Sequence, residues 1–184
     1  PVDIQGSRVE ESELESFIPE SKKSTIVASQ IDEIVELLNN AKRPVIYAGA
    51  GVNIANARDS FRALVEKIAA PVLLHWNGID LIENDHPLFA GRPGAVGQRA
   101  ANFTLQNADV LISIGTRLAL LQTGYNFAGY VRNAKHIMVD IDQAELDKKT
   151  LHPYMKVCSD AGEFIDALNS HKDLKKKDYI EWVT

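Results

Sequence analysis

The residue types that could bind a nucleotide follow short apolar runs in this sequence. Gly49-Ala50-Gly51 comes directly after the run 45–48. Glycines let the backbone bend sharply there, and they let a phosphate approach backbone N–H groups at the start of a helix. Gly115 and Arg117 follow the run 110–114, and Asp142 follows the run 136–141. An arginine can contact a phosphate and a carboxylate can accept a ribose hydroxyl, so the pattern indicates a nucleotide site.

The glycines and the arginine also have purely structural explanations. Ile54 stands where a G-x-G-x-x-G fingerprint has its third glycine, so Gly49-Ala50-Gly51 equally fits a tight turn from strand to helix. Arg117 equally fits an arginine on a surface loop. The sequence leaves both interpretations of each feature open.

Two aspartates and a His-Trp pair complete the set of candidate binding residues. Asp142, with Glu145 on the next helical turn, and Asp160 each precede an expected helix. An aspartate in that place suits the N-cap position as well as a ligand contact. His75 and Trp76 end another apolar run, and we expect them to line a pocket.

The sequence contains no evident arrangement of residues for catalysis or metal binding. His136 opens an apolar run and His86 lies in a loop, and neither has a Cys, His or carboxylate at metal-ligand spacing. There is no Ser-His-Asp arrangement and no nucleophile elbow. We therefore expect no catalytic residue and no metal site in this chain.

Composition narrows the possible partners and the compartment. The net charge of -5 argues against nucleic acid, because phosphate binding needs a basic surface. No apolar run reaches the roughly 18–20 residues of a membrane span, and no signal peptide opens the chain. Cys158 is the single cysteine, so an internal disulfide is excluded. We expect a cytoplasmic protein that binds neither nucleic acid nor membrane.

Apolar runs and helical spacing alternate along the chain. Buried strands are predicted at 45–48, 71–74, 110–114, 136–141 and 155–158, and helices at 29–38, 61–68, 100–106 and 161–168. This alternation predicts an α/β fold, a Rossmann-like doubly wound parallel sheet of about five or six strands with helices on both faces. A loop is expected at 75–97 and a solvated helix end at 172–177, and the strand order stays open.

Five segments share their order and spacing with a known family. They are Lys42 to Gly51 (R-P-(apolar)₄-G-x-G), Ala70 to Val72, Gly94 to Asn102, Asn107 to Arg117 and Val139 to Leu146. Together they resemble the central domain of the thiamine-diphosphate-dependent enzymes typified by acetolactate synthase and pyruvate oxidase. The resemblance covers about residues 29–171.

The resemblance implies a piece of a longer polypeptide. Pro1 to Gln5 is similar to the P-x-D-(V/I)-Q that leaves the N-terminal pyrimidine-binding domain of the family. Residues 1–28 are then a linker from that domain, 29–171 the central Rossmann-like domain, and 172–184 a linker towards the C-terminal diphosphate-binding domain. The flanking domains are the implied partners, in an enzyme that forms a homo-oligomer when full length.

The family's chemistry would lie in those flanking domains. The resemblance implies condensation or decarboxylation of 2-keto acids by the full-length enzyme, with acetolactate synthase-like condensation of pyruvate as the leading expectation. Thiamine diphosphate and Mg²⁺ would bind there, because the family's Gly-Asp-Gly motif for them does not occur in this sequence. The fragment alone is expected not to be catalytic.

For the central domain itself the resemblance implies FAD in some members, an adenine nucleotide such as ADP in others, and only a structural role in the rest. Carried over by position, the FAD contacts are Gly49, Ala50, Gly51, His75, Trp76, Arg117, Thr123, Gly124, Asp142 and Asp160. The chain departs from the acetolactate synthase pattern at residues 119–121, which are Ala-Leu-Leu, and at Val96. Charged and polar residues stand there in acetolactate synthase, and their absence counts against FAD.

Two alternatives remain beside nucleotide binding. One is a purely structural spacer that also contributes to an oligomer interface and binds no ligand. The other is a sirtuin-like NAD-dependent deacylase, because Gly49 to Val52 and Asp59 to Arg62 echo the sirtuin G-A-G-(I/V) and D-F-R segments. Sirtuins usually carry two cysteine pairs for zinc, whereas this chain has Cys158 alone.

Overall fold

The computed structural model describes residues 2–18, 24 and 26–183. Its central element is an all-parallel sheet of six strands in the order β3-β2-β1-β4-β5-β6. The strands are β1 (Pro44–Ala48), β2 (Val72–Leu74), β3 (Phe89–Gly91), β4 (Val110–Ile114), β5 (Lys135–Asp140) and β6 (Met155–Cys158). The predicted doubly wound parallel α/β sheet is confirmed, and the structure adds the strand order.

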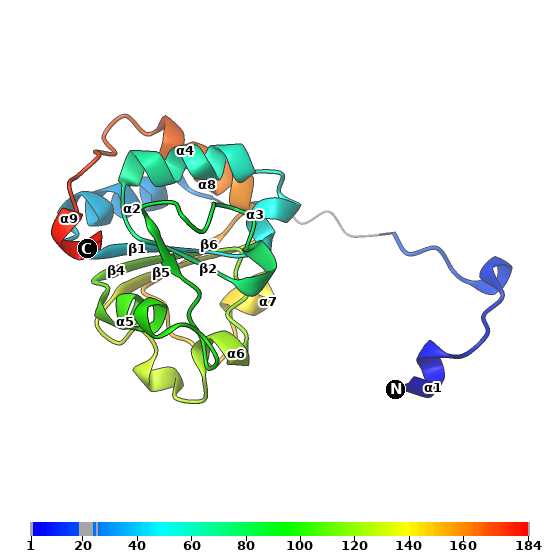
Figure 1. The fold of residues 1–184 in the computed structure, drawn as a ribbon. Helices are drawn as coiled ribbons and strands as arrows, with labels where there is room; N and C mark the ends of the chain where they lie inside the picture. Colours follow the sequence, from blue (N-terminus) through cyan, green and yellow to red (C-terminus); the bar gives the residue numbers. More distant parts are fainter. Residues whose placement is uncertain (1, 19–23, 25, 184) are drawn as a thin grey trace.

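Helices cover both faces of the sheet (Figure 1). The helices α2 (Ala28–Asn40), α4 (Arg58–Ile68) and α8 (Ala161–Ser170) pack on one face, and α5 (Arg99–Asn107) packs on the other. The shorter helices are α1 (Val2–Gln5), α3 (Ala50–Ile54), α6 (Leu120–Thr123), α7 (Gln143–Leu146) and α9 (Ile180–Val183), with 3-10 turns at Glu11–Glu13, Trp76–Gly78 and Phe127–Gly129. None of the helices that the structure describes has the length and apolar character needed to cross a membrane.

The central strands are buried on both faces, which explains their uninterrupted apolar sequences. All five residues of β1 and all five of β4 are buried. Successive side chains of a strand point to opposite faces, so Ile46 and Ala48 enter the core under α2, α4 and α8, while Val45 and Tyr47 enter the core under α5. Strands covered on both faces read as continuous apolar runs, as in other parallel sheets.

The structure differs from the sequence prediction at β3 and at the start of α2. The strand β3 lies inside the predicted loop 75–97 and pairs with β2 through an irregular register. Its three residues, Phe-Ala-Gly, are too few to form a recognisable apolar run. The helix α2 begins at Ala28, and Val27 at its N-cap position provides no side-chain cap, so Ser29 lies within the first turn.

The segment 172–179 is not helical, in contrast to the predicted helix end. Leu174 and Tyr179 are buried against the core. The Tyr179 hydroxyl donates to the Leu38 carbonyl oxygen at 3.3 Å, and the Trp182 indole N–H donates to the Pro44 carbonyl oxygen at 3.1 Å. These contacts hold the C-terminal segment along α2 and β1.

Polar side chains are buried on the α5 face of the sheet. The Ser113 hydroxyl and Nε2 of His136 are 2.8 Å apart, and the His136 side chain is buried. Burial lowers the pKa of His136 to about 3, and the positive charge of Lys148 acts in the same direction. The imidazole is therefore neutral in the folded protein at physiological pH. The Gln122 amide N–H donates to the Tyr47 hydroxyl at 3.2 Å, also out of contact with solvent.

Candidate functional site

A cleft lies at the carboxyl edge of the sheet, where the chain changes direction. From β1 the chain moves to β2 and β3 on one side, and it then crosses to β4, β5 and β6 on the other. Ligands of doubly wound sheets bind at such a switch point. The cleft has a volume of about 590 Å³, within the usual range of small-molecule sites. We refer to it as the carboxyl-edge cleft.

Seven of the predicted site residues line the carboxyl-edge cleft. They are Ala50, Gly51, His75, Gly115, Arg117, Asp142 and Asp160. They come from different strand ends, which parallel strands place at the same edge of the sheet. The structure therefore brings together residues that are more than a hundred positions apart in the sequence.

The glycines in the turn after β1 pack directly against the backbone at the end of β4. The Gly49 N–H donates to the Ile114 carbonyl oxygen at 3.0 Å, and the Gly51 N–H donates to the Gly115 carbonyl oxygen at 3.0 Å. A Cβ on Gly51 would lie 2.6 Å from the Gly115 Cα, so only glycine fits there. Gly115 itself has φ +56°, in the left-handed region that favours glycine. The turn uses its glycines, and two of its amides, for contact between backbone segments.

Acidic side chains outnumber basic ones in the cleft. Asp140, Asp142, Glu145 and Asp160 line it, against the single arginine Arg117. The Arg117 Nε is 2.7 Å from a Glu145 oxygen, so the guanidinium is already paired. Burial raises the pKa of Asp140 above its usual range, and the negative charges of Glu145 and Asp142 add to that effect. The electrostatics of the cleft favour hydroxyl groups or cations over phosphates.

The two aspartates that precede helices cap them, as one of the two interpretations predicted. Asp142 accepts the Ala144 N–H at 3.0 Å. Asp160 accepts the N–H groups of Gly162 at 2.8 Å and Glu163 at 3.2 Å. The capping role is confirmed for both residues, while a ligand contact by either stays a prediction.

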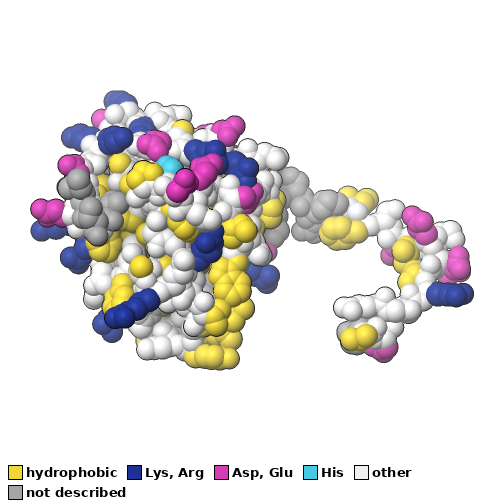
Figure 2. All heavy atoms as spheres, in the orientation of Figure 1, with side chains coloured by type: hydrophobic (Ala, Val, Ile, Leu, Met, Phe, Trp, Pro, Cys, Tyr) yellow, Lys and Arg dark blue, Asp and Glu magenta, His cyan; other side chains and the backbone are white. Residues whose placement is uncertain are grey.

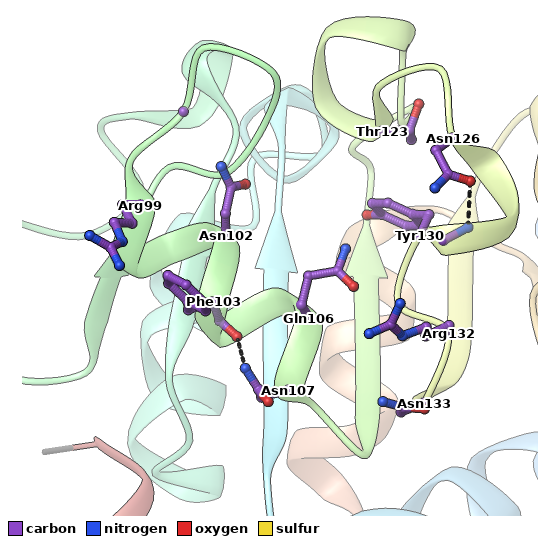
Figure 3. Close-up of a pocket in the computed structure, with 12 residues that line it drawn as sticks. Arg99, Asn102, Phe103, Gln106, Asn107, Thr123, Asn126, Tyr130, Arg132 and Asn133 are labelled. Atoms are coloured by element: carbon purple, nitrogen blue, oxygen red, sulfur yellow. Dashed lines mark hydrogen bonds between the residues drawn. The ribbon is translucent and has the colours of Figure 1, made fainter.

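The remaining predicted residues lie outside the cleft lining. Gly49 is buried beneath it, and Trp76 lies in the 3-10 turn after β2 with 46% of its surface exposed. Gly124 has φ +68° and no atom within 4 Å of its Cβ position. Thr123 lines a different cavity on the α5 side of the sheet (Figure 3). Of the predicted site residues, Thr123 thus lies in a separate cavity, and Gly49, Trp76 and Gly124 line neither the cleft nor that cavity.

Sequence reasoning missed Gln122, which holds the loop after β4 in place. Its side-chain amide donates to the Thr116 carbonyl oxygen at 3.1 Å and accepts the Ala119 N–H at 2.6 Å. Arg117 and Leu118 between them have φ +58° and +51°, which is unusual for residues with side chains. A buried glutamine in a helical turn carries no sequence signal of this role, because the role depends on the fold of the loop.

No group of three or more His, Cys, Asp or Glu side chains is arranged to hold a metal ion among the residues that the structure describes. The four carboxylates of the cleft contact helix ends and basic side chains instead. His75, the histidine of the cleft, accepts the Asn77 N–H at its Nδ1 at 3.3 Å. The carboxyl-edge cleft is built for binding or for packing.

Comparisons of the sequence with a family model and with known proteins agree on one enzyme family. A family model described as "Thiamine pyrophosphate enzyme, central domain" matches residues 31–168. A probable acetolactate synthase large subunit of Methanococcus aeolicus is 41% identical over 119 residues, which are 65% of this chain and 20% of that protein. The acetolactate synthase large subunit of Corynebacterium glutamicum is 35% identical over 163 residues, 87% of this chain and 26% of that protein.

A third relative differs in its described activity. The sulfoacetaldehyde acetyltransferase of Roseovarius nubinhibens is 39% identical over 113 residues, 60% of this chain and 19% of that protein. The chain therefore spans about a quarter or less of the length of these three relatives. The match over residues 31–168 leaves the short sirtuin-like echo at 49–62 without support.

Proposed function

This chain belongs to the thiamine pyrophosphate enzyme family as a central domain of the acetolactate synthase-like type, and from that premise we propose that its function is structural. In the longer protein it would join an N-terminal pyrimidine-binding domain to a C-terminal diphosphate-binding domain. The match of residues 31–168 and the names of the relatives support this placement.

We propose that the parent enzyme condenses or decarboxylates 2-keto acids and works as a homo-oligomer. Thiamine diphosphate supplies a carbanion equivalent for such chemistry when it is bound. The match to a central domain of this family supports placing thiamine diphosphate and Mg²⁺ on the flanking domains. This domain would then hold the two flanking domains at the correct positions and spacing. None of its own residues would contact the reacting atoms.

The structural role leaves FAD out, and the contacts at the carboxyl edge support that choice. A pyrophosphate requires free backbone N–H groups or basic side chains. Here the amides of Gly49 and Gly51 are already bonded to the backbone after β4, and Arg117 is paired with Glu145. Leu121 and Val96, which are apolar where the resemblance to acetolactate synthase implies polar or charged residues, are exposed at 60% and 69%. The occupied turn amides are the observation on which the structural role depends.

A second candidate function is the binding of an adenine nucleotide through its ribose. The end of β5 places Asp140 and Asp142 in the lining of the carboxyl-edge cleft, and carboxylates at this position accept ribose hydroxyls in related folds. The diphosphate of ADP would then have to extend past the acidic lining into solvent. One experiment distinguishes this candidate from the structural role.

We expect thermal unfolding of the chain to be unchanged by a large excess of FAD, coenzyme A or NAD. A ligand at about 100 times its dissociation constant adds roughly 2.7 kcal/mol, and each kcal/mol raises the midpoint of such a domain by about 2–4 °C. Scanning calorimetry in the presence of each compound measures the shift. An increase with ADP alone would select the second candidate.

The variant Arg117→Gln is the matched control, because Arg117 is the only arginine or lysine lining the cleft among the described residues. If FAD raised the midpoint of the wild-type chain by several degrees and the shift disappeared in Arg117→Gln, the structural proposal would be overturned. A shift that survived in the variant would point to binding elsewhere and would equally contradict the absence of an FAD site.

A further inference from the structure

A second cavity lies on the α5 side of the sheet, between α5 and the segment 123–133 (Figure 3). Its volume is about 790 Å³, enough for a small organic molecule. We call it the α5 cavity. It is lined by five carboxamide side chains: Asn102, Gln106, Asn107, Asn126 and Asn133. Arg99 and Arg132 also line it, and no aspartate or glutamate does.

The two arginines of the α5 cavity differ from the other arginines of the folded domain. Arg43, Arg58, Arg62, Arg92 and Arg117 each donate a hydrogen bond to a carboxylate, an amide or a carbonyl oxygen. Within the described part of the chain, Arg99 contacts only the Phe103 ring, at 5.3 Å, and Arg132 has no hydrogen bond or ion pair. Both guanidinium groups retain their full capacity to bind an anion.

Figure 3 shows how these groups are distributed around the cavity. Arg99 comes from the first turn of α5 and Arg132 from the loop before β5, and they stand on opposite sides of the hollow. Gln106 lies between them. The Asn102 side chain is hydrogen-bonded to the backbone of Gly94, at 2.9 and 3.0 Å. The side chains of Gln106 and Asn133 have no hydrogen bond within the described residues and are available to hydroxyl groups.

The lining of the α5 cavity has the opposite charge character to that of the carboxyl-edge cleft. In the view of Figure 2 the acidic side chains of the folded part lie mainly over the half with α2, α4 and α8, whereas lysines and arginines lie over both halves. The net charge of the chain is -5, so a cavity lined by two arginines and no carboxylate is more positive than the average surface of the protein. An anion is attracted here and repelled at the carboxyl-edge cleft.

We propose that the α5 cavity binds a sugar-like organic anion, a polyhydroxylated molecule with a phosphate or carboxylate group. Arg99 or Arg132 takes the acidic group, because a guanidinium matches both phosphate and carboxylate geometry. The carboxamides of Gln106 and Asn133 take the hydroxyl groups, since each amide offers both donors and an acceptor. The buried ring of Tyr130 forms part of the wall. This site shares no lining residue with the carboxyl-edge cleft.

Calorimetric titration with three matched probes tests the proposal. Glucose 6-phosphate, gluconate and glucose share most of their hydroxyl groups and differ in the acidic group. We expect at least one of the two anions to bind at least tenfold more tightly than glucose, and the comparison between them identifies the acidic group that the site prefers. The binding should weaken as salt is added, because the arginines are exposed.

Substitutions of the two lining arginines test whether the anion binds in the α5 cavity. Of Arg99→Gln and Arg132→Gln, the variant that removes the arginine holding the acidic group is expected to weaken anion binding about tenfold, because it removes a charge-assisted contact. Lys172→Gln removes the same charge from a distant exposed position and should leave the affinity within twofold. Binding of neither anion, equal binding of glucose, or anion binding unaffected by both arginine variants would overturn the proposal. Because both arginines are exposed, the variants should unfold at the same temperature as the wild type.

Discussion

Replacing Gly51 by alanine is expected to lower the free energy of unfolding by about 3 kcal/mol or more. The added Cβ would lie 2.6 Å from the Gly115 Cα and 3.1 Å from the Gly115 carbonyl oxygen. These are backbone atoms held in place by β4, so no flexible side chain can move aside. The close approach also carries the Gly51 N–H to Gly115 oxygen hydrogen bond, which would lengthen. Chemical denaturation followed by circular dichroism measures the change.

The matched control for this substitution is Gly124→Ala. Gly124 has φ +68° but no atom within 4 Å of its Cβ position, so alanine there meets backbone strain alone. With ψ -172° as well, Gly124 is in a region that glycine alone readily adopts, and that strain costs about 1–3 kcal/mol. If Gly51→Ala were as stable as the wild type, the close packing of the Gly51 backbone against Gly115 would be contradicted. The glycines would then have to be explained by the approach of a ligand.

Between about pH 7.5 and pH 5, the free energy of unfolding of the wild-type chain is expected to fall by about 2 kcal/mol more than that of His136→Gln. Burial lowers the pKa of His136 from 6.5 to about 3 in the folded protein, with a smaller contribution from Lys148. Between these two values the unfolded chain binds a proton that the folded chain does not. Stability contributed by neutral His136 is therefore complete above pH 6.5 and is lost as the pH falls towards 3.

Comparing the two proteins isolates His136 from the other titrating groups. The pKa of Asp140 is raised by burial, and its contribution to stability has the opposite dependence on pH, but it is present in both proteins. Glutamine keeps a polar group for the Ser113 hydroxyl and does not titrate in this range. Urea unfolding at several pH values measures the difference. Parallel stability curves for the two proteins would show that His136 is accessible to protons in the folded state.

The sheet could be predicted from sequence because its strands are buried on both faces. Runs such as 45–48 and 110–114 are apolar without interruption, and the structure places them as β1 and β4. The strand β3 could not be found in the same way, since Phe-Ala-Gly is only three residues long. The strand order was open because short apolar runs carry no information on which strands are neighbours.

The position of the cleft followed from the sequence, but its chemical character did not. Parallel strands end at one edge, so Gly51, Arg117 and Asp142 were expected to meet, and they line one cleft. The engagement of the Gly51 amide depends on β1 and β4 being neighbours. The pairing of Arg117 with Glu145 depends on the loop that Gln122 holds. Both contacts depend on how the chain folds in three dimensions, and both reduce the ability of the cleft to bind a phosphate.

The α5 cavity was outside the sequence prediction altogether. Arginines and amides on α5 and in the segment 123–133 look like ordinary surface residues, because nothing in their spacing marks them as neighbours. Thr123, which the family resemblance assigned to FAD, lies in this cavity and not at the carboxyl edge. A site made from a helix face and a distant loop becomes visible only when both are placed on the same side of the sheet.

Amide resonances of Gly49 and Gly51 test the central claim, that the turn after β1 is occupied by its own backbone contacts. Both N–H groups donate to carbonyl oxygens at 3.0 Å, so they should exchange slowly with solvent. In ¹H–¹⁵N spectra of the labelled chain, we expect neither resonance to move when FAD or ADP is added in excess. Saturable shifts of these two amides with either compound would contradict the account and would show that a diphosphate binds at this turn.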